Sequence, residues 1–205
     1  GAGNDTIQVE TNLTSADTIV GGDGTDTLSV VASTSIADIS FTNVDGVETL
    51  ALTTAGTVTL GAQAQEAGIV TVTGSAAAST VSASAYTVGL TYNSASTAAA
   101  DSVTTGTGND VFVFAGNANA LSVDDTISAS TGTDTIQLNN DLGTVGADLS
   151  FGNVTGVEQI TVLDANGTSA GTAQSVTLTL SGSASSGTYG VASVTIDGSA
   201  ITDAS

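Results

Sequence analysis

The stretch Gly21-Gly22-Asp23-Gly24-Thr25-Asp26-Thr27-Leu28-Ser29-Val30 joins a glycine-rich turn to a short strand that alternates apolar and small polar residues. Glycines at its first, second and fourth positions allow the tightly curled, positive-φ backbone that other residues resist. Backbone carbonyl oxygens can then converge with the Asp26 carboxylate. Oxygen atoms crowded in this way, with no amine to neutralise them, suit a hard cation such as Ca²⁺.

The charge of the chain points the same way. Its 205 residues include 20 Asp and Glu but no Lys, Arg or His, for a net charge of −20. No two side chains can therefore form a salt bridge, and self-repulsion is relieved only by screening, protonation or bound cations. Binding of nucleic acid through phosphate neutralisation is unsupported. No run of 18 apolar residues predicts a membrane span.

The same composition argues against catalysis. Without His, Cys or Lys the chain lacks the usual bases and nucleophiles, and no Lys or Arg is present to stabilise an oxyanion. We therefore predict that this chain is not an enzyme.

Short strands with alternating apolar and small polar residues recur about every 17 to 24 residues. They are expected at 27–30, 49–52, 69–72, 88–92, 111–114, 135–138, 159–162, 177–180 and 193–196. This spacing predicts an all-β fold, a parallel β-solenoid with stacked coils of about that length. An antiparallel sandwich is the alternative, because it also uses short alternating strands. Stacking favours the solenoid because it explains both the recurring spacing and the recurring turns.

Two copies of a longer pattern divide the chain into predicted modules at 1–100 and 101–205, offset by about 105 to 110 positions. The paired segments are 1–7 with 106–112, 17–19 with 125–127, 24–28 with 132–136, and 41–50 with 151–160. Phe41 and Phe151, which begin the last pair, are expected to fill the solenoid core.

Each module is predicted to hold one calcium site. Asp5 and Asp26 are 21 residues apart, and Asp110 and Asp134 are 24 apart. Each pair is therefore expected at one edge of neighbouring coils, with its members about 4.8 Å apart. A divalent cation between the two carboxylates would relieve their repulsion. Carbonyl donors are expected from Gly3, Gly22 and Gly24 in the first site, and from Gly108 and Gly132 in the second. Ala129 and Ser130 replace the two leading glycines of the second site.

Other acidic residues allow two interpretations. Asp17, Asp101 and Asp125 each lie nine residues before a predicted ligand, at the half-turn position, where they are either turn-capping residues or weak secondary ligands. Glu48 and Glu158 occupy equivalent positions in the two modules. A repeated surface position explains them better than a glycosidase-type carboxylate pair.

These motifs resemble those of RTX-type bacterial surface-layer proteins and the related large RTX adhesins. Residues 21–29 fit the calcium-binding nonapeptide G-G-x-G-x-D-x-U-x at every fixed position. The resemblance extends to Gly-x-Gly-Asn-Asp-x-Ile at 1–7 and Asn-Val-x-Gly-Val-Glu-Thr-Leu at 43–50. It implies type I secretion, an extracellular location at the bacterial cell surface, and Ca²⁺ that folds the chain and joins copies into a lattice. By this resemblance Asp5, Asp26, Asp110 and Asp134 are the ligand aspartates.

Three functions follow as expectations. The first is a calcium-stabilised structural protein of a surface layer, with other copies of itself and calcium as partners, and cell-surface polysaccharide bound through regions outside this sequence. The second is an adhesin or extension module, and the third is an exported enzyme whose catalytic domain lies elsewhere. Gly1 lies inside a motif that lacks its leading residue, so we expect a fragment or a processed piece.

Overall fold

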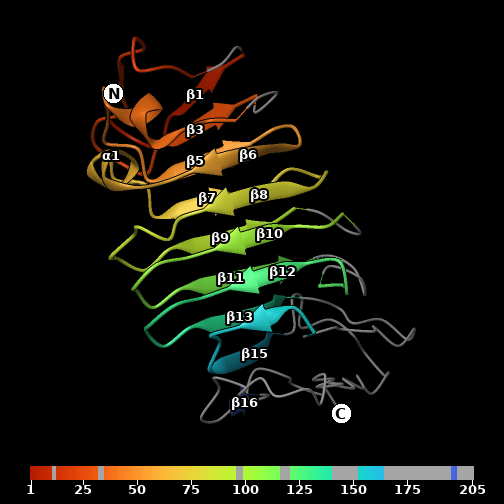
Figure 1. Ribbon diagram of the computed structural model, residues 1–205. Helices are drawn as coiled ribbons and strands as arrows, with labels where there is room; N and C mark the ends of the chain where they lie inside the picture. Colours follow the sequence, from red (N-terminus) through yellow and green to blue (C-terminus); the bar gives the residue numbers. More distant parts are fainter. Residues whose placement is uncertain are drawn as a thin grey trace, which may run out of the picture.

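The computed structural model is a stack of coils in which each strand pairs in parallel with its equivalent in the next coil (Figure 1). It describes residues 1–10, 13–31, 35–95, 99–115, 121–139, 152–163 and 195–197. Every strand pairing among these residues is parallel, as a solenoid requires. The predicted parallel β-solenoid is confirmed, and the antiparallel sandwich is wrong.

One face of the stack is a nine-stranded sheet, here called the front sheet. In spatial order its strands are β1 (Thr6–Val9), β3 (Thr27–Val30), β5 (Thr49–Leu52), β7 (Thr71–Thr73), β9 (Thr91–Ser94), β11 (Val111–Ala115), β13 (Thr135–Asn139), β15 (Gln159–Leu163) and β16 (Thr195–Asp197). From β1 to β15, aligned residues are between 20 residues apart (Thr71 and Thr91) and 24 apart (Val111 and Thr135). These separations lie within the predicted coil length.

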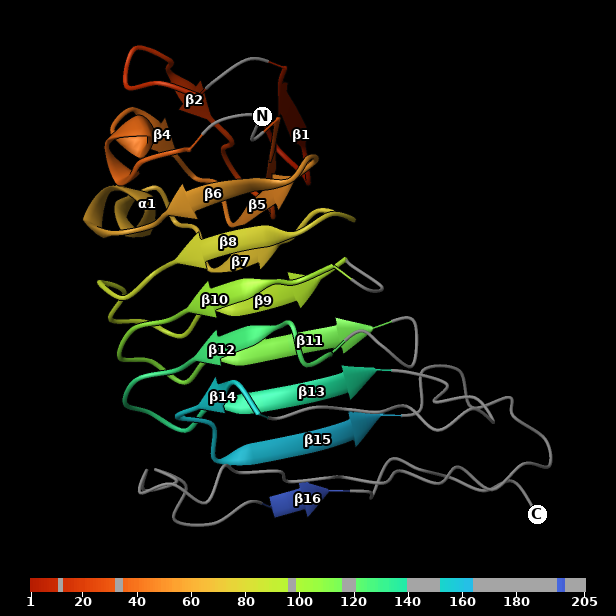
Figure 2. The same ribbon diagram turned by 45° about the vertical axis from the view of Figure 1, so that its right-hand side comes forward.

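The opposite face is a five-stranded back sheet whose strands run against those of the front sheet (Figure 2). It contains β6 (Gly56–Thr59), β8 (Ser79–Ser82), β10 (Ser102–Thr104), β12 (Thr126–Ser128) and β14 (Val154–Thr155). A separate short sheet pairs β2 (Ile19–Val20) with β4 (Val44–Asp45). From β1 to β14, each coil thus has a front-sheet strand and a strand on the opposite side, and the two coil ends that join them form distinct edges.

Two short helices interrupt the coils, a 3₁₀ helix η1 (Asp38–Phe41) and α1 (Ala62–Glu66). The carboxylate of Asp38 accepts the backbone N–H of Gly61 at 2.7 Å and of Ala64 at 3.0 Å. One coil therefore caps the helix of the next, because the first N–H groups of a helix have no partner within it. Neither helix of the described residues has the length and hydropathy needed to cross a bilayer.

The core lies between the two sheets and consists of stacked apolar side chains. The central inward position of the front sheet carries a continuous buried column: Leu28, Leu50, Val72, Tyr92, Phe112, Ile136 and Ile160. The back sheet contributes the column Val58, Val81, Val103 and Ile127. Because alternate residues of a strand point to opposite faces, most small polar residues of the strands lie outside, although Ser79 of β8 and Ser94 of β9 are buried.

Some details differ from expectation. Strands begin at Thr71 and Thr91, later than the predicted 69 and 88, because Ile69 and Leu90 are buried in the turns that precede them. Phe41 is 1% exposed, which confirms its place in the core. Phe151 and the strand predicted at 177–180 lie outside the described residues. The division into modules 1–100 and 101–205 stays a prediction, although β9 pairs with β11 across that boundary.

We expect Phe112→Ala to lower the free energy of unfolding by about 3–5 kcal/mol, because the ring is fully buried in the core column and its loss leaves a cavity between coils. Urea unfolding in excess calcium measures the change. Val113→Ala, on the half-buried outer face of the same strand, is the matched control and should cost far less. Equal losses at the two positions would contradict the inward orientation of Phe112.

Candidate metal centre

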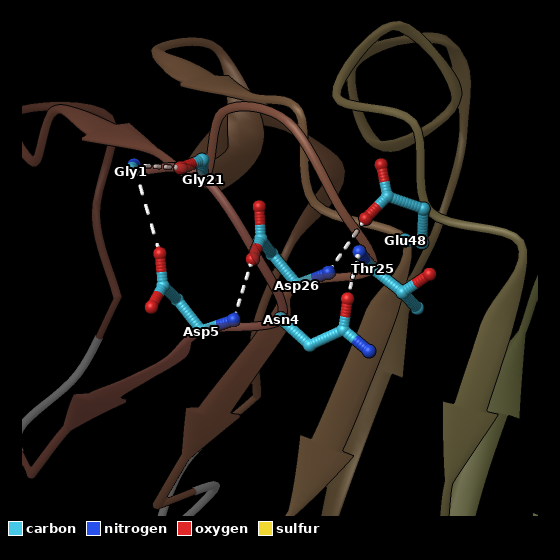
Figure 3. Close-up of polar contacts among 7 residues, drawn as sticks. All are labelled: Gly1, Asn4, Asp5, Gly21, Thr25, Asp26 and Glu48. Carbon is cyan, nitrogen blue, oxygen red and sulfur yellow. Dashed lines mark hydrogen bonds and ion pairs between the residues drawn. The ribbon is translucent and has the colours of Figure 1, made fainter.

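Acidic residues align at the edge where front-sheet strands begin. Each occupies the position immediately before a strand, so that register brings it beside its equivalent in the next coil. The first row is Asp5, Asp26 and Glu48, and the second is Asp110, Asp134 and Glu158. Figure 3 shows the first row, with the three carboxylates in neighbouring coils. We call these the carboxylate rows.

The same type of hydrogen bond joins neighbouring members of the first row. The backbone N–H of each member donates to the carboxylate of the member in the following coil. Asp5 N donates to Asp26 Oδ1 at 2.7 Å, and Asp26 N donates to Glu48 Oε2 at 2.7 Å (Figure 3). A hydrogen bond to a carboxylate is stronger than one between neutral groups. Each coil is thus held to the next through its turn.

The second row repeats this pattern. Asp110 N donates to Asp134 Oδ1 at 2.8 Å, and Asp134 N donates to Glu158 Oε2 at 2.9 Å. This hydrogen-bonding pattern also includes the preceding coil, since Leu90 N donates to Asp110 Oδ1 at 2.8 Å. The structure therefore brings together both predicted aspartate pairs, Asp5 with Asp26 and Asp110 with Asp134.

An asparagine beside each row forms a second bond between coils. Asn4 Oδ1 accepts the N–H of Thr25, and Asn109 Oδ1 accepts the N–H of Thr133, both at 2.9 Å. Neither asparagine is among the residues predicted from the sequence, and no role in the turns was predicted for Glu48 or Glu158. Repetition in the sequence could have identified these four residues, because Asn-Asp and Gly-Val-Glu occur in both modules at equivalent positions.

Three carboxylates of the rows are buried with one oxygen unpaired. Asp26, Asp110 and Asp134 are each 0% exposed, and the Oδ2 atom of each has no hydrogen-bond partner. An ionised oxygen that is buried without a partner is costly. A bound cation would offset this cost, so these residues fit a metal ion.

The glycine turn of the first row brings two oxygen atoms close to residue 21. A Cβ atom at Gly21 would collide with both Asp26 Oδ2 and the carbonyl oxygen of Gly46. The unpaired carboxylate oxygen and a backbone carbonyl thus converge on the space that a side chain at residue 21 would fill. In the second module Ala129 occupies the equivalent place, since its N–H bonds to Thr155 O at 3.0 Å as that of Gly21 bonds to Asp45 O.

The other predicted carbonyl donors line successive turns. Gly22 and Gly24 have φ of 111° and 138°, and side chains there would strike the carbonyls of Gly1 and Gly3 in the preceding turn. In the second module a side chain at Gly132 would strike the carbonyl of Gly108 in the same way. The carbonyl groups of each turn therefore face the glycines of the next.

Asp17 and Asp125 lie at the other end of the coils, where strands of the back side begin. Asp17 Oδ2 accepts the N–H of Thr14 at 2.9 Å, and Asp125 Oδ2 accepts the N–H of Ser122 at 2.6 Å. Asp125 Oδ1 also accepts Asp101 N at 2.7 Å. These are the bonds of turn-capping residues, and a ligand role for either residue stays a prediction.

Side chains alone do not complete a metal site. Within the described segments, no group of three or more acidic side chains is placed to hold one ion. Calcium takes six to eight oxygen ligands, many of them backbone carbonyls. In the first row the carbonyl of Gly46 is such a group, and it lies with Asp26 Oδ2 beside Gly21.

We predict that acidification promotes folding of the calcium-free chain through Asp134. Burial, with the charges of Asp110 and Glu158, raises the pKa of Asp134 to about 6, against about 3.9 in an unfolded chain. Stability from this group is therefore present at low pH and is lost as the pH rises through 6. Between pH 7 and 5 the calcium-free folding equilibrium should gain about tenfold, or about 1.4 kcal/mol, from it.

Circular dichroism of wild type and Asp134→Asn in calcium-free buffer isolates this contribution, because the two proteins differ only at this carboxyl group. The variant should gain less β-structure on acidification than wild type. An identical gain would show that Asp134 does not carry the effect.

We also predict that Gly21→Ala weakens calcium binding by about tenfold or more, because its methyl group would displace Asp26 Oδ2 or the Gly46 carbonyl. Ala129→Gly is the reciprocal change in the second module and should strengthen binding there. Isothermal titration with calcium compares them. Wild-type affinity in Gly21→Ala would rule out the space beside residue 21 as part of the site.

Comparison with known proteins agrees with this geometry. The family model for the RTX calcium-binding nonapeptide repeat, which comprises four copies, matches residues 13–29 and 120–141. These segments contain Asp26 and Asp134. Searches of curated proteins and of solved structures found no match. Because RTX nonapeptide repeats bind calcium, the cofactor of this chain is Ca²⁺, and the chain carries RTX repeats within a β-solenoid.

Proposed function

We propose that this chain is a calcium-stabilised structural segment of a secreted bacterial protein that forms part of a cell-surface layer. The observation that carries the proposal is the set of buried aspartates, Asp26, Asp110 and Asp134, each with an unpaired carboxylate oxygen. A fold that buries such groups needs a cation, and RTX repeats bind calcium.

The location follows from the supply of that cation. Extracellular calcium modules bind with dissociation constants of roughly 10⁻⁴ to 10⁻³ M, so millimolar calcium outside the cell fills them and micromolar calcium inside does not. The chain would thus stay unfolded in the cytosol and fold after export. RTX repeats are typical of secreted proteins, which supports an extracellular location.

A structural role fits the side chains of the rows better than a catalytic one. Asp26, Asp110 and Asp134 are fully buried and hydrogen-bonded to neighbouring coils, so no substrate reaches them. The chain has no His, Cys or Lys to act as base or nucleophile. We propose that it is not an enzyme.

Association of copies into a layer is the finer part of the proposal. Exposed carboxylates flank the glycine turns, including those of Asp23 and Asp45. On a chain of net charge −20, divalent ions between facing carboxylates are the simplest way to bring two copies together. Calcium would then act twice, first within each solenoid and then between copies.

An extension module of a large adhesin is the second candidate. The front sheet continues through every coil from β1 to β16, which makes the described solenoid a straight stack (Figure 1). Such a stack would serve as a spacer that holds a binding domain away from the cell. Assembly behaviour distinguishes it from a layer protein.

We expect the chain to lose most of its β-structure in chelator and to regain it in millimolar calcium. Circular dichroism and urea unfolding measure this change, and unchanged structure and stability in chelator would contradict calcium-coupled folding. Electron microscopy of the calcium-loaded protein then tests assembly. Two-dimensional arrays support the surface layer, and separate rods that remain soluble support the extension module.

A further inference from the structure

Both carboxylate rows end in a glutamate. We propose that Glu48 and Glu158 are positioning residues of the calcium turns, and that their negative charge sets how tightly each module holds calcium. This inference rests on the proposed calcium-dependent fold. It assigns a role to two residues outside the nonapeptide turns that end in Asp26 and Asp134.

Each glutamate is bonded to the preceding aspartate in both directions. Glu158 Oε2 accepts the N–H of Asp134 at 2.9 Å, and Glu158 N donates to the carbonyl oxygen of Asp134 at 3.1 Å. Glu48 makes the equivalent bonds with Asp26, at 2.7 and 3.3 Å. The peptide units of both aspartates are thereby fixed in place by the glutamate of the following coil.

The fixed aspartates are the ones with an oxygen available to a ligand. Asp26 and Asp134 are each 0% exposed, and in both the Oδ2 atom lacks a partner. Because neighbouring coils lie about 4.8 Å apart, the glutamate charge acts at close range on this buried oxygen. In the calcium-free state it repels the ionised aspartate, and in the calcium-bound state it attracts the ion.

The two rows are separated along the edge, so each can be tested independently. Between them, the register positions are occupied by Val70 and Leu90, which carry no charge. Val70 N donates to the carbonyl oxygen of Glu48 at 3.0 Å, so the coil stack continues where the row of carboxylates stops. Sites more than 7–10 Å apart contribute additively.

Capping and charge predict different outcomes for different substitutions. Glu→Gln keeps an oxygen that accepts the aspartate N–H and removes only the charge. Glu→Asp keeps the charge and shortens the side chain. If Glu158 only caps an N–H, Glu158→Asp is the damaging change. If its charge attracts calcium, Glu158→Gln is the damaging change.

The experiment follows folding by circular dichroism during calcium titration of the full chain and of Glu48→Gln, Glu158→Gln and the double variant. We expect the calcium midpoint to rise about threefold to tenfold for each single variant, and by roughly the product for the double variant. With an osmolyte as the folding agent in calcium-free buffer, the same variants should fold more readily than wild type, because a repulsive charge has been removed.

Two further variants serve as controls. Glu66→Gln removes an exposed charge on α1 outside the rows and should leave the calcium midpoint unchanged. Asp38→Asn alters a carboxylate that caps α1 across coils and should disfavour folding with calcium and with osmolyte alike. This common direction is the signature of a purely structural cap.

The inference is overturned if the glutamine variants have the same calcium midpoint as Glu66→Gln. It is also overturned if, like Asp38→Asn, they disfavour folding in both the calcium titration and the osmolyte titration. A wild-type chain that does not respond to calcium at all would instead refute the proposed function. The two failures are therefore distinguishable.

Discussion

A backbone N–H that donates to a carboxylate of the next coil is the contact on which this solenoid depends at its glycine-rich edge. It occurs at Asp5, Asp26, Leu90, Asp110 and Asp134, always in the same direction along the stack. In Asp26, Asp110 and Asp134 the bond uses one carboxylate oxygen and leaves the other without a hydrogen-bond partner. On the proposed function, the same side chain would hold neighbouring coils together and bind a cation.

The internal repeat is visible in these contacts as well as in the sequence. Asn43 Nδ2 donates to Ser15 O in the first module, and Asn153 Nδ2 donates to Val123 O in the second, both at 2.7 Å. The carboxylate rows and the Asn4 and Asn109 bonds recur with them. Equivalent turns of the two predicted modules therefore make the same contacts, and the coils between them, with Val70 and Leu90 at the register positions of the rows, continue the front sheet.

Sequence reasoning predicted the parts that have a distinctive periodicity or turn chemistry. Front-sheet strands such as Thr27–Val30 and Thr135–Asn139 alternate clearly, and the spacing of Asp5 from Asp26 placed both at one edge. The back sheet was missed as a strand layer, because β8 and β10 each bury a single valine among serine and threonine. Glu48 looked like a surface residue because its hydrogen-bond partner, Asp26, lies 22 residues away in the preceding coil.

Because the whole sequence lacks basic side chains, no lysine or arginine neutralises the carboxylates that make these contacts. A lysine or arginine beside Asp26 or Asp134 would neutralise the buried carboxylate permanently, and the solenoid would then fold wherever it was synthesised. Asp26, Asp110 and Asp134 accept hydrogen bonds at one carboxylate oxygen only, so a metal ion from solution is the counter-charge that the proposed function assigns to them. The same apolar columns and parallel ladders are available in both cases, so the ion does not determine which fold forms. On the proposed function, the ion determines in which compartment that fold is stable.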